Sequence, residues 1–375
     1  MWMTQLFANY LQNRPLHTIT IPGTHDSGCY VDSMIWGRVA RTQAANMAAQ
    51  LAGGIRYFDL RPAIARDGSY WTYHGPYWGD SFDNILQSLA NFFTGNPAAN
   101  RKLVVLNISH FNGTWTNDMH VHFIDYLRNT LGDRLVQYNQ NSVTAANNVN
   151  LFNANYGQLL VNPDDHSVRS RVAILYDGAM DQATAPYLAN PALTLPRGFF
   201  LVNKYAINQA ANSLTLFDQY SNASGVDDMA TTQYRKLTQR GDRAIAPAQF
   251  GVNYPVNPAG GAQGTLHLLS WTCTYWIRSA RTTIVDRAAS DVNPRLKRFF
   301  VRDPLNPVPS WSYHPERDPK INIIYTDHFA SATSNAFGGG HPDQALGLMA
   351  MPVALAAKLN KYGAGAQAWT GWDGW

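Results

Sequence analysis

Short apolar stretches alternate with helix-like stretches along most of this 375-residue chain. Residues 102–109 are almost wholly apolar, which is typical of a strand that is buried on both faces of a parallel sheet. Strand-like stretches occupy 18–21, 55–61, 102–109, 172–177, 198–206, 266–275 and 321–329, and helix-like stretches occupy 43–52, 82–93, 119–131, 227–239 and 342–359. This alternation predicts an α/β fold with parallel strands, either a barrel or a doubly wound sheet.

The chain contains no charge block, low-complexity linker or internal repeat that would divide it. Its length of 375 residues suits one α/β barrel with insertions. Two segments rich in Asn, Pro and Gly, at 138–164 and 246–264, are long for structureless connections, so we expect them to be insertions on the barrel rim. We therefore predict a single catalytic domain over residues 1–375.

The amino-acid composition limits which partners the protein can bind and indicates where it acts. Only 14% of the residues are charged, so the polar surface must consist largely of Asn, Gln, Thr, Ser and Tyr, a pattern commoner outside cells. We expect a secreted protein, although no signal sequence precedes the first strand and an intracellular location stays open. The net charge is +4, but no run of Lys and Arg exceeds two residues, which argues against nucleic-acid binding. The sequence indicates no obligate protein partner.

The two cysteines, Cys29 and Cys273, are far apart in the sequence and lack the spacing of a zinc site. One disulfide and two free thiols both fit the sequence.

The first strand-like stretch is followed by Pro22-Gly23 and then by His25 and Asp26. A Pro-Gly pair commonly ends a strand, so we expect His25 and Asp26 to lie in a loop. Because surface loops are polar in any case, this pair alone is weak evidence of function.

Other titratable residues also follow predicted strands. Asp59 and Arg61 lie two positions apart, so strand alternation places both on the same face. His74 ends a further strand-like run that precedes a Pro-Tyr-Trp-Gly loop, and Asp327 ends the last strand. Because functional groups of a parallel barrel gather at the C-terminal ends of its strands, we expect all these side chains to meet.

Two histidines, an arginine and several carboxylates suit the cleavage of a phosphodiester. One imidazole removes a proton from the attacking hydroxyl, and the other protonates the leaving alkoxide. The guanidinium binds the phosphate oxygens through charge-assisted hydrogen bonds. Each carboxylate fixes the tautomer of its imidazole and stabilises the protonated form.

Three motifs, in this order and at this spacing, resemble the X-box region of the phosphatidylinositol-specific phospholipase C family. They are Pro-Gly-Thr-His-Asp-Ser-Gly at 22–28, Arg-Tyr-Phe-Asp-Leu-Arg at 56–61, and His-Gly at 74–75. The resemblance implies a single distorted TIM (β/α) barrel. It also implies an intramolecular attack that converts phosphatidylinositol, or its glycosylated anchors, into diacylglycerol and inositol 1,2-cyclic phosphate, which is then hydrolysed slowly.

The resemblance assigns the acid and base roles residue by residue. His25 would be the general base on the inositol 2-hydroxyl, oriented by Asp327. His74 would be the general acid toward the diacylglycerol oxygen, assisted by Asp26.

The resemblance also assigns Arg61 to the phosphate, with Asp59 beside it as a supporting carboxylate. Calcium-dependent members resemble this sequence but carry a carboxylate where Arg61 stands, because calcium needs several oxygen ligands. The arginine therefore predicts a bacterial-type, calcium-independent enzyme that needs no metal or other cofactor.

The headgroup contacts are similar to those of the family only in part. Asn203 stands at the acidic position and Tyr205 at the stacking position of the family segment that faces inositol. Bacterial members place basic residues after two further strands, but here those strands end in His110 and Asp177. We expect Asp177 to replace some of these contacts and His110 to be structural.

Trp36 and Trp78 follow the His25 loop and His74, where an enzyme acting at a lipid surface would touch the bilayer. Aromatic rings favour the headgroup boundary. We expect both residues to support a transient, peripheral contact with membranes that contain phosphatidylinositol.

Two other functions compete with the phospholipase. A glycerophosphodiester phosphodiesterase on a related barrel needs a Glu-rich metal site, and no Glu lies near the motifs. A catalytically inactive, inositol-lipid-binding barrel would need neither the pair of histidines nor the arginine.

Overall fold

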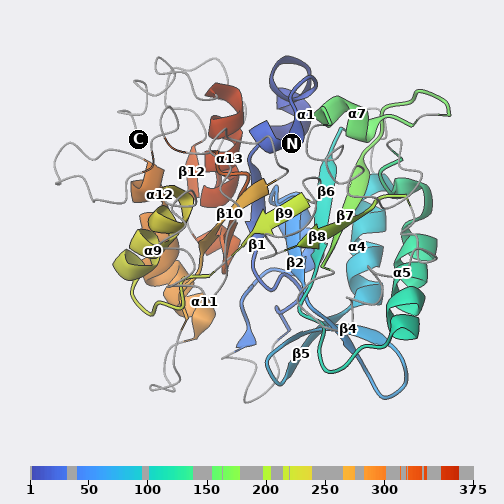
Figure 1. Ribbon diagram of the computed structural model, residues 1–375. Helices are drawn as coiled ribbons and strands as arrows, with labels where there is room; N and C mark the ends of the chain where they lie inside the picture. Colours follow the sequence, from blue (N-terminus) through green and yellow to red (C-terminus); the bar gives the residue numbers. More distant parts are fainter. Residues whose placement is uncertain are drawn as a thin grey trace.

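The computed structural model describes residues 2–31, 40–94, 101–137, 154–162, 164–177, 197–203, 214–218, 220–238, 265–274, 283–300, 313, 318, 320–331, 333–335 and 348–362. The long parallel strands are β1 (Ile21–Thr24), β2 (Tyr57–Leu60), β6 (Leu103–Ile108), β7 (Arg171–Asp177), β8 (Phe199–Asn203), β9 (Leu214–Phe217), β10 (Thr265–Trp271) and β11 (Ile323–Thr326). They close into a barrel in the order β1-β11-β10-β9-β8-β7-β6-β2 (Figure 1). The predicted α/β barrel is therefore confirmed.

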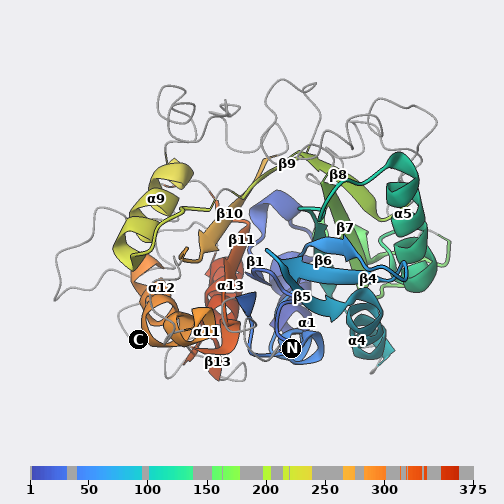
Figure 2. The same cartoon turned by 90° about the horizontal axis from the view of Figure 1, so that it is seen from below.

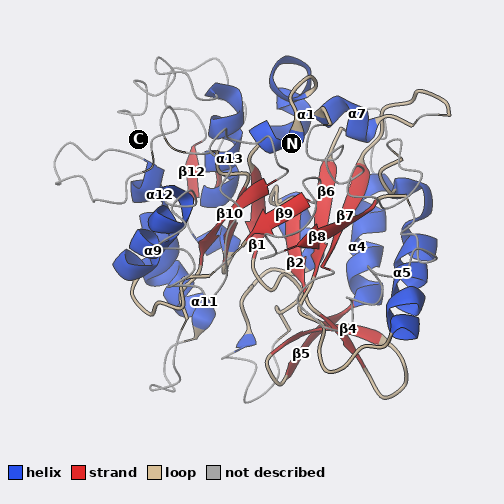
Figure 3. Ribbon diagram, in the orientation of Figure 1, coloured by secondary structure: helices blue, strands red, loops and turns tan. Residues whose placement is uncertain are grey.

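Helices lie outside this barrel (Figures 2 and 3). The α-helices are α1 (Trp2–Leu6), α3 (Met47–Ala52), α4 (Phe82–Thr94), α5 (Asn117–Leu131), α7 (Tyr156–Leu160), α9 (Val226–Thr238), α11 (Ile284–Arg287), α12 (Asn293–Phe300) and α13 (Met351–Tyr362). In the described part of the chain they are accompanied by the π-helical turns η1 (Phe7–Leu11) and η5 (Ala288–Val292) and by the 3-10 turns η2 (Leu16–Thr18), η4 (Gly132–Arg134) and η6 (Phe329–Ser331). No helix in the described part of the chain has the length and apolarity that crossing a bilayer requires.

The helices form where the sequence supplies caps and an apolar face. In α4 the buried residues Phe82, Ile85, Leu86 and Leu89 recur at helical spacing and face the barrel. α5 starts after Thr116, whose hydroxyl accepts the Met119 backbone N–H. The predicted helices at 82–93, 119–131 and 227–239 are thus confirmed, whereas the one predicted from residue 43 starts only at Met47, after the Asn46 cap.

The expectation that Pro22-Gly23 ends the first strand is wrong. β1 continues through both residues and pairs in parallel with β11 and β2. A side chain at Gly23 would place its Cβ 2.9 Å from Tyr57 Cδ1 and 3.1 Å from Tyr325 Cβ. The glycine therefore permits close packing of the barrel strands, and it does not mark a turn.

The run that ends in His74 is not a barrel strand. It is β4 (Tyr70–His74) of an antiparallel sheet with β3 (Pro62–Ile64) and β5 (Tyr77–Ser81). The predicted loop after His74 is instead a tight hairpin that begins at Gly75, whose φ of 58° suits glycine, and continues directly into β5. The sheet, of which β4 and β5 are labelled in Figure 1, lies at one end of the barrel, below β2 in that view.

Some predicted segments fall partly or wholly outside the described residues. The insertion expected at 246–264 lies outside them, as do residues 138–153 of the other insertion, whose remainder contains α7. The helix predicted from residue 342 starts at Met351 within the described residues, after β13 (Leu348–Ala350), which pairs with β12 (Thr333–Asn335). That the whole chain is one domain stays a prediction.

Candidate active site

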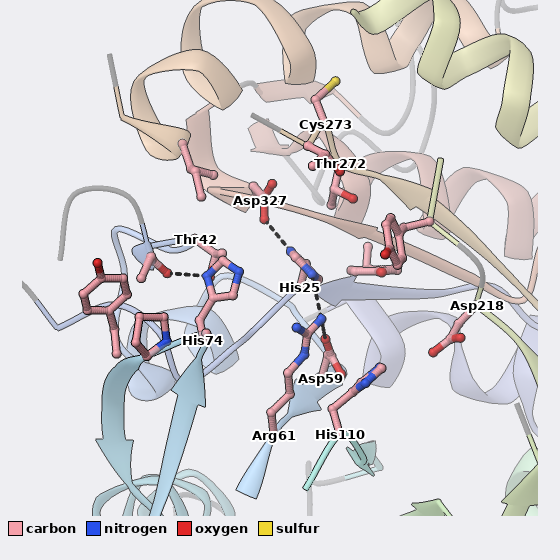
Figure 4. Close-up of a pocket in the computed structure, with 18 residues that line it drawn as sticks. His25, Thr42, Asp59, Arg61, His74, His110, Asp218, Thr272, Cys273 and Asp327 are labelled. Atoms are coloured by element: carbon pink, nitrogen blue, oxygen red, sulfur yellow. Dashed lines mark hydrogen bonds and ion pairs between the residues drawn. The ribbon is translucent and has the colours of Figure 1, made fainter. Parts of the chain in front are cut away.

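A cavity of about 480 Å³ opens where the barrel strands β1, β2, β6, β9, β10 and β11 end (Figure 4). Two sets of its described lining residues carry the chemistry considered below. We call the first set, with the buried Asp26 behind it, the charged wall: His25, Asp26, Asp59, Arg61, His74 and Asp327. We call the second set the polar wall: His110, Asp218, Tyr220, Thr272 and Thr274.

His25 directly follows β1 and is held from two sides. Its Nδ1 lies 2.8 Å from Oδ1 of Asp327, and because a carboxylate accepts, Nδ1 carries the proton. The Gln43 amide donates to the carbonyls of His25 and Thr326 at 3.0 Å each, which clamps the ends of β1 and β11 together. The Nε2 of His25 is thereby left as the nitrogen that exchanges protons.

The pKa of His25 reflects opposing effects. Burial by itself lowers it, but the charges of Asp26 and Asp327, together with the hydrogen bond to Asp327, outweigh burial and raise the pKa to about 9. Arg61 Nη2 lies 3.0 Å from His25 Nε2 and lowers the pKa in turn. The Arg61 guanidinium thus stabilises the neutral form of the His25 ring, while Asp26 and Asp327 stabilise its cation.

Arg61 lies between β2 and β3 and is paired with two carboxylates. Its Nε lies 2.5 Å from Asp26 Oδ1, and its Nη2 lies 3.5 Å from Asp59 Oδ2. Burial lowers the pKa of Arg61, but these two charges raise it beyond its usual value, so the guanidinium is a permanent cation. Asp59 is oriented in turn by the Asn107 amide at 3.3 Å and by the backbone N–H of Asp26 at 3.2 Å.

Asp26 contacts both histidines. Its Oδ2 lies 3.4 Å from His25 Nε2 and 3.6 Å from His74 Nε2. Its other carboxylate oxygen, Oδ1, makes the shortest of these ion-pair contacts, with Arg61 Nε. The residue adopts a φ of 42°, a conformation that non-glycine residues seldom take. The structure therefore places Asp26 at the centre of the charged wall, whereas the sequence associated it with His74 alone.

His74 reaches the cavity from the hairpin. Its Nδ1 lies 2.9 Å from the Ala40 carbonyl, which can only accept, so this nitrogen carries a proton. Its Nε2 faces Asp26, and its ring centroid lies 6.3 Å from that of His25. Two imidazoles therefore present Nε2 toward one space beside the guanidinium.

His25, Asp26 and Asp59 have ligand atoms within 4.8 Å of one another, close enough to hold a metal ion. The Arg61 guanidinium, however, already pairs with both carboxylates. A divalent cation held there would lie against a fixed positive charge, so these residues do not fit a metal site.

The polar wall contains residues that the sequence did not identify as part of the site. His110, expected to be structural, follows β6 and lines the cavity with a φ of 56°. Asp218 and Tyr220 follow β9, a strand that was not predicted. The available signal was the short apolar run 214–217 followed by an acidic residue and then a tyrosine two positions later.

The residues predicted for the headgroup are only partly described. Asp177 ends β7 and Asn203 ends β8, both at the cavity end of the barrel, but their side chains lie outside the described part of the chain. Tyr205 and Trp36 lie wholly outside it. Trp78 is 47% exposed on β5.

Cys29 and Cys273 are both buried, and the structure contains no disulfide bond between them.

Sequence comparison finds relatives among PI-PLC X-domain proteins and a phosphatidylinositol phosphodiesterase, although no protein-family profile matches the chain. "PI-PLC X domain-containing protein 3" of Danio rerio is 30% identical over an alignment of 162 residues that covers 36% of this chain and 48% of that protein. "1-phosphatidylinositol phosphodiesterase" of Listeria monocytogenes is 25% identical over an alignment of 210 residues that covers 54% of this chain and 63% of that protein. The predicted resemblance to the phosphatidylinositol-specific phospholipase C family is confirmed. The aligned part spans less than two thirds of either relative.

Solved structures of phosphatidylinositol-specific phospholipases C share the fold over most of the chain. The F249X mutant from Staphylococcus aureus gives a TM-score of 0.56 at 14% identity and covers 95% of this chain and 96% of that one. The enzyme from Listeria monocytogenes gives a TM-score of 0.50 at 19% identity, with 88% and 93% covered. The barrel as a whole, beyond the motif region, is therefore the fold of these enzymes.

Proposed function

We propose that the chain is a phosphatidylinositol-specific phospholipase C. It cleaves the glycerophosphodiester bond of phosphatidylinositol, or of glycosylated anchors, to diacylglycerol and inositol 1,2-cyclic phosphate. The observation that carries the proposal is the charged wall, in which the Nε2 atoms of His25 and His74 both face the Asp26 carboxylate that pairs with Arg61.

His25 acts as the general base. A bound phosphate draws the N–H of Arg61 Nη2 away from His25 Nε2, and this nitrogen then accepts the proton of the inositol 2-hydroxyl. Asp327 and Asp26 stabilise the imidazolium that forms. Because the pKa of His25 is about 9 before substrate binds, only a minority of molecules hold the neutral base at pH 7, and activity rises as the pH increases.

His74 acts as the general acid. The Ala40 carbonyl fixes the proton on Nδ1, so the transferable proton resides on Nε2. Asp26, 3.6 Å away, stabilises this protonated ring until it donates to the diacylglycerol oxygen. The O–P bond to diacylglycerol breaks as the bond from the 2-hydroxyl oxygen to phosphorus forms.

Arg61 binds the non-bridging phosphate oxygens. Its pairs with Asp26 and Asp59 fix the guanidinium before substrate arrives, which is the arrangement that stabilises charge developing in a transition state. We propose that the reaction needs no metal, because Arg61 supplies the positive charge at the place where the carboxylates could otherwise hold a cation.

The polar wall binds the inositol ring. Asp218 can accept hydrogen bonds from ring hydroxyls, and Tyr220 offers an aromatic face beside it. Arg61 is the one Lys or Arg side chain among the described lining residues, and it serves the phosphodiester. This distribution favours an inositol without further phosphate groups, because Asp218 would repel them.

Exposed apolar side chains beside the cavity suit contact with a lipid surface. Large apolar residues that are exposed in the described part of the chain are Val31, Trp78, Val168 and Tyr220. Tyr220 lines the cavity, and Trp78 lies on the hairpin strand that follows His74. We therefore propose transient, peripheral membrane binding, and we propose secretion on the basis of the low charged content.

Phosphorus NMR of the products formed from phosphatidylinositol vesicles, with and without EGTA, tests this function. We expect a cyclic phosphodiester signal that appears first and at equal rates in both samples. Phosphatidate and free inositol as products, which require cleavage on the inositol side of the phosphorus, would indicate a reaction of the glycerophosphodiesterase type instead. Vesicle binding without any product would indicate an inactive lipid-binding barrel.

A further inference from the structure

The general acid His74 is not held by the barrel strands. It ends β4, in the sheet β3-β4-β5, while His25 and Arg61 flank barrel strands. The distance between His74 and the rest of the charged wall therefore depends on how this sheet docks against the loop that follows β1.

Two glycines make that docking close. A Cβ on Gly79 of β5 would lie 2.4 Å from Thr72 Oγ1 and 2.6 Å from the Gly28 carbonyl oxygen. A Cβ on Gly28 would lie 2.3 Å from Thr72 Oγ1. Neither glycine has a positive φ, so glycine is needed at these positions for space and not for backbone conformation.

Hydrogen bonds fix the same contact. The Asp80 backbone N–H donates to the Gly28 carbonyl at 2.9 Å, and the Thr72 hydroxyl donates to the Asp80 carbonyl at 2.9 Å. Thr72 is 1% exposed, so nothing in solvent competes for its hydroxyl.

A β-bulge lies at this point of the hairpin. Trp71 pairs with Ser81 and Tyr73 pairs with Trp78, so β5 contributes one extra residue opposite Thr72. Bulges of this kind redirect side chains next to active sites. Thr72 lies two residues before His74 on β4, and the bulge lets its hydroxyl reach the Asp80 carbonyl on β5.

We propose that Gly28, Thr72 and Gly79 form a docking joint that positions His74 for proton transfer to the leaving oxygen. The three are positioning residues, because they act through His74 and do not touch the substrate. Gly28 lies two residues after Asp26, so the joint sets the separation of His74 Nε2 from the Asp26 carboxylate, 3.6 Å here. This inference depends on the proposed function of His74.

The test compares two water-soluble inositol phosphodiesters in Gly79→Ala. One has an alkyl leaving group, which needs a proton from the general acid, and the other has a nitrophenyl leaving group, which departs without one. We expect kcat to fall by roughly tenfold or more on the alkyl ester and by less than about threefold on the nitrophenyl ester. The quantity compared between variants is the ratio of kcat on the alkyl ester to kcat on the nitrophenyl ester. His74→Ala, which removes the general acid itself, is the reference variant and must lower this ratio as well.

Gly68→Ala is the matched control for damage to the same sheet. Gly68 lies in the turn between β3 and β4, has a φ of 85° and has no atom within 4 Å of an added Cβ. We expect this variant to lower the melting temperature and to leave the ratio of the two rates unchanged.

If Gly79→Ala does not fold, Thr72→Val tests the docking joint in its place, because valine keeps the shape of the threonine side chain and removes its hydroxyl. We expect a smaller change of ratio in the same direction and recovery of the wild-type ratio in Thr72→Ser. Equal losses on both esters in the folded joint variants would overturn the inference. Failure of the wild-type protein to cleave either ester would refute the proposed function itself.

Discussion

The two walls of the cavity differ in how their polar groups are held. In the charged wall the side chains of Asp26, Asp59 and Asp327 are buried, and their contacts with His25, Arg61 and His74 measure 2.5–3.6 Å. In the polar wall Asp218 is only half-buried and Tyr220 is 51% exposed. Groups that are paired before substrate binds can stabilise a transition state without rearranging. Groups that keep contact with solvent, as Asp218 and Tyr220 do, are suited to binding a polyol, because hydrogen bonds to water are exchanged for hydrogen bonds of similar strength to the ring hydroxyls.

The largest expected effect is that of His25→Ala. Removing the base lowers kcat on phosphatidylinositol by about 10²- to 10⁴-fold, because the proton acceptors that remain beside Arg61 are the Asp26 and Asp59 carboxylates, which are weaker bases than an imidazole and are paired with the guanidinium. Sedimentation with phosphatidylinositol vesicles should be unchanged, since binding is assigned to the polar wall and the exposed rim. Residual activity above a tenth of wild type would break the assignment of chemistry to the charged wall.

Asp327→Asn should move the pH dependence. Asp327 raises the pKa of His25, so the amide variant lowers that pKa from about 9, and the base becomes available at lower pH. The rising limb of kcat/KM against pH therefore shifts to lower pH, while the maximum falls because the tautomer of His25 is no longer fixed. Asp165→Asn, in an exposed ion pair with Arg169 away from the cavity, is the control and should leave the profile unchanged.

Trp78→Ala should have the smallest of these effects. Losing the exposed indole weakens vesicle binding by roughly tenfold, which corresponds to about 1.4 kcal/mol, and leaves turnover of a soluble short-chain substrate unchanged. Val168→Ala changes a comparably exposed apolar residue outside the cavity and should alter neither quantity. An equal loss in both assays for Trp78→Ala would indicate that the indole has a packing role in the hairpin.

The sequence predicted the charged wall better than the polar wall for a physical reason. His25, Asp59, Arg61 and Asp327 lie within or directly beyond sequence runs rich in β-branched and aromatic residues, so the rule that functional groups gather at strand ends predicts that they meet. Asp218 follows β9, which is no shorter than β1, β2 or β11 but whose Leu-Thr-Leu-Phe run shows too little pattern to predict a strand.

A glycine explains one of the errors in the predicted fold. A glycine that allows close packing looks in sequence like one that allows a turn, so the Pro22-Gly23 pair wrongly predicts the end of a strand. The contact of Gly28 with Gly79 joins segments distant in the chain, so it appears only in the structure. The alternation of strands and helices, which depends on local hydrophobic pattern alone, did predict the barrel.

The central claim is that the charged wall carries out the chemistry and the polar wall binds the inositol ring. It is tested most directly by measuring kcat and KM separately for Arg61→Lys and Asp218→Asn on a soluble inositol phosphodiester. Lysine keeps the charge but cannot form the paired contacts of the guanidinium, so we expect kcat to fall by about 100-fold or more. Asp218→Asn weakens hydrogen bonds to ring hydroxyls, so we expect KM to rise by about tenfold with kcat within about threefold of wild type. A fall in kcat for Asp218→Asn as large as that for Arg61→Lys would contradict this claim.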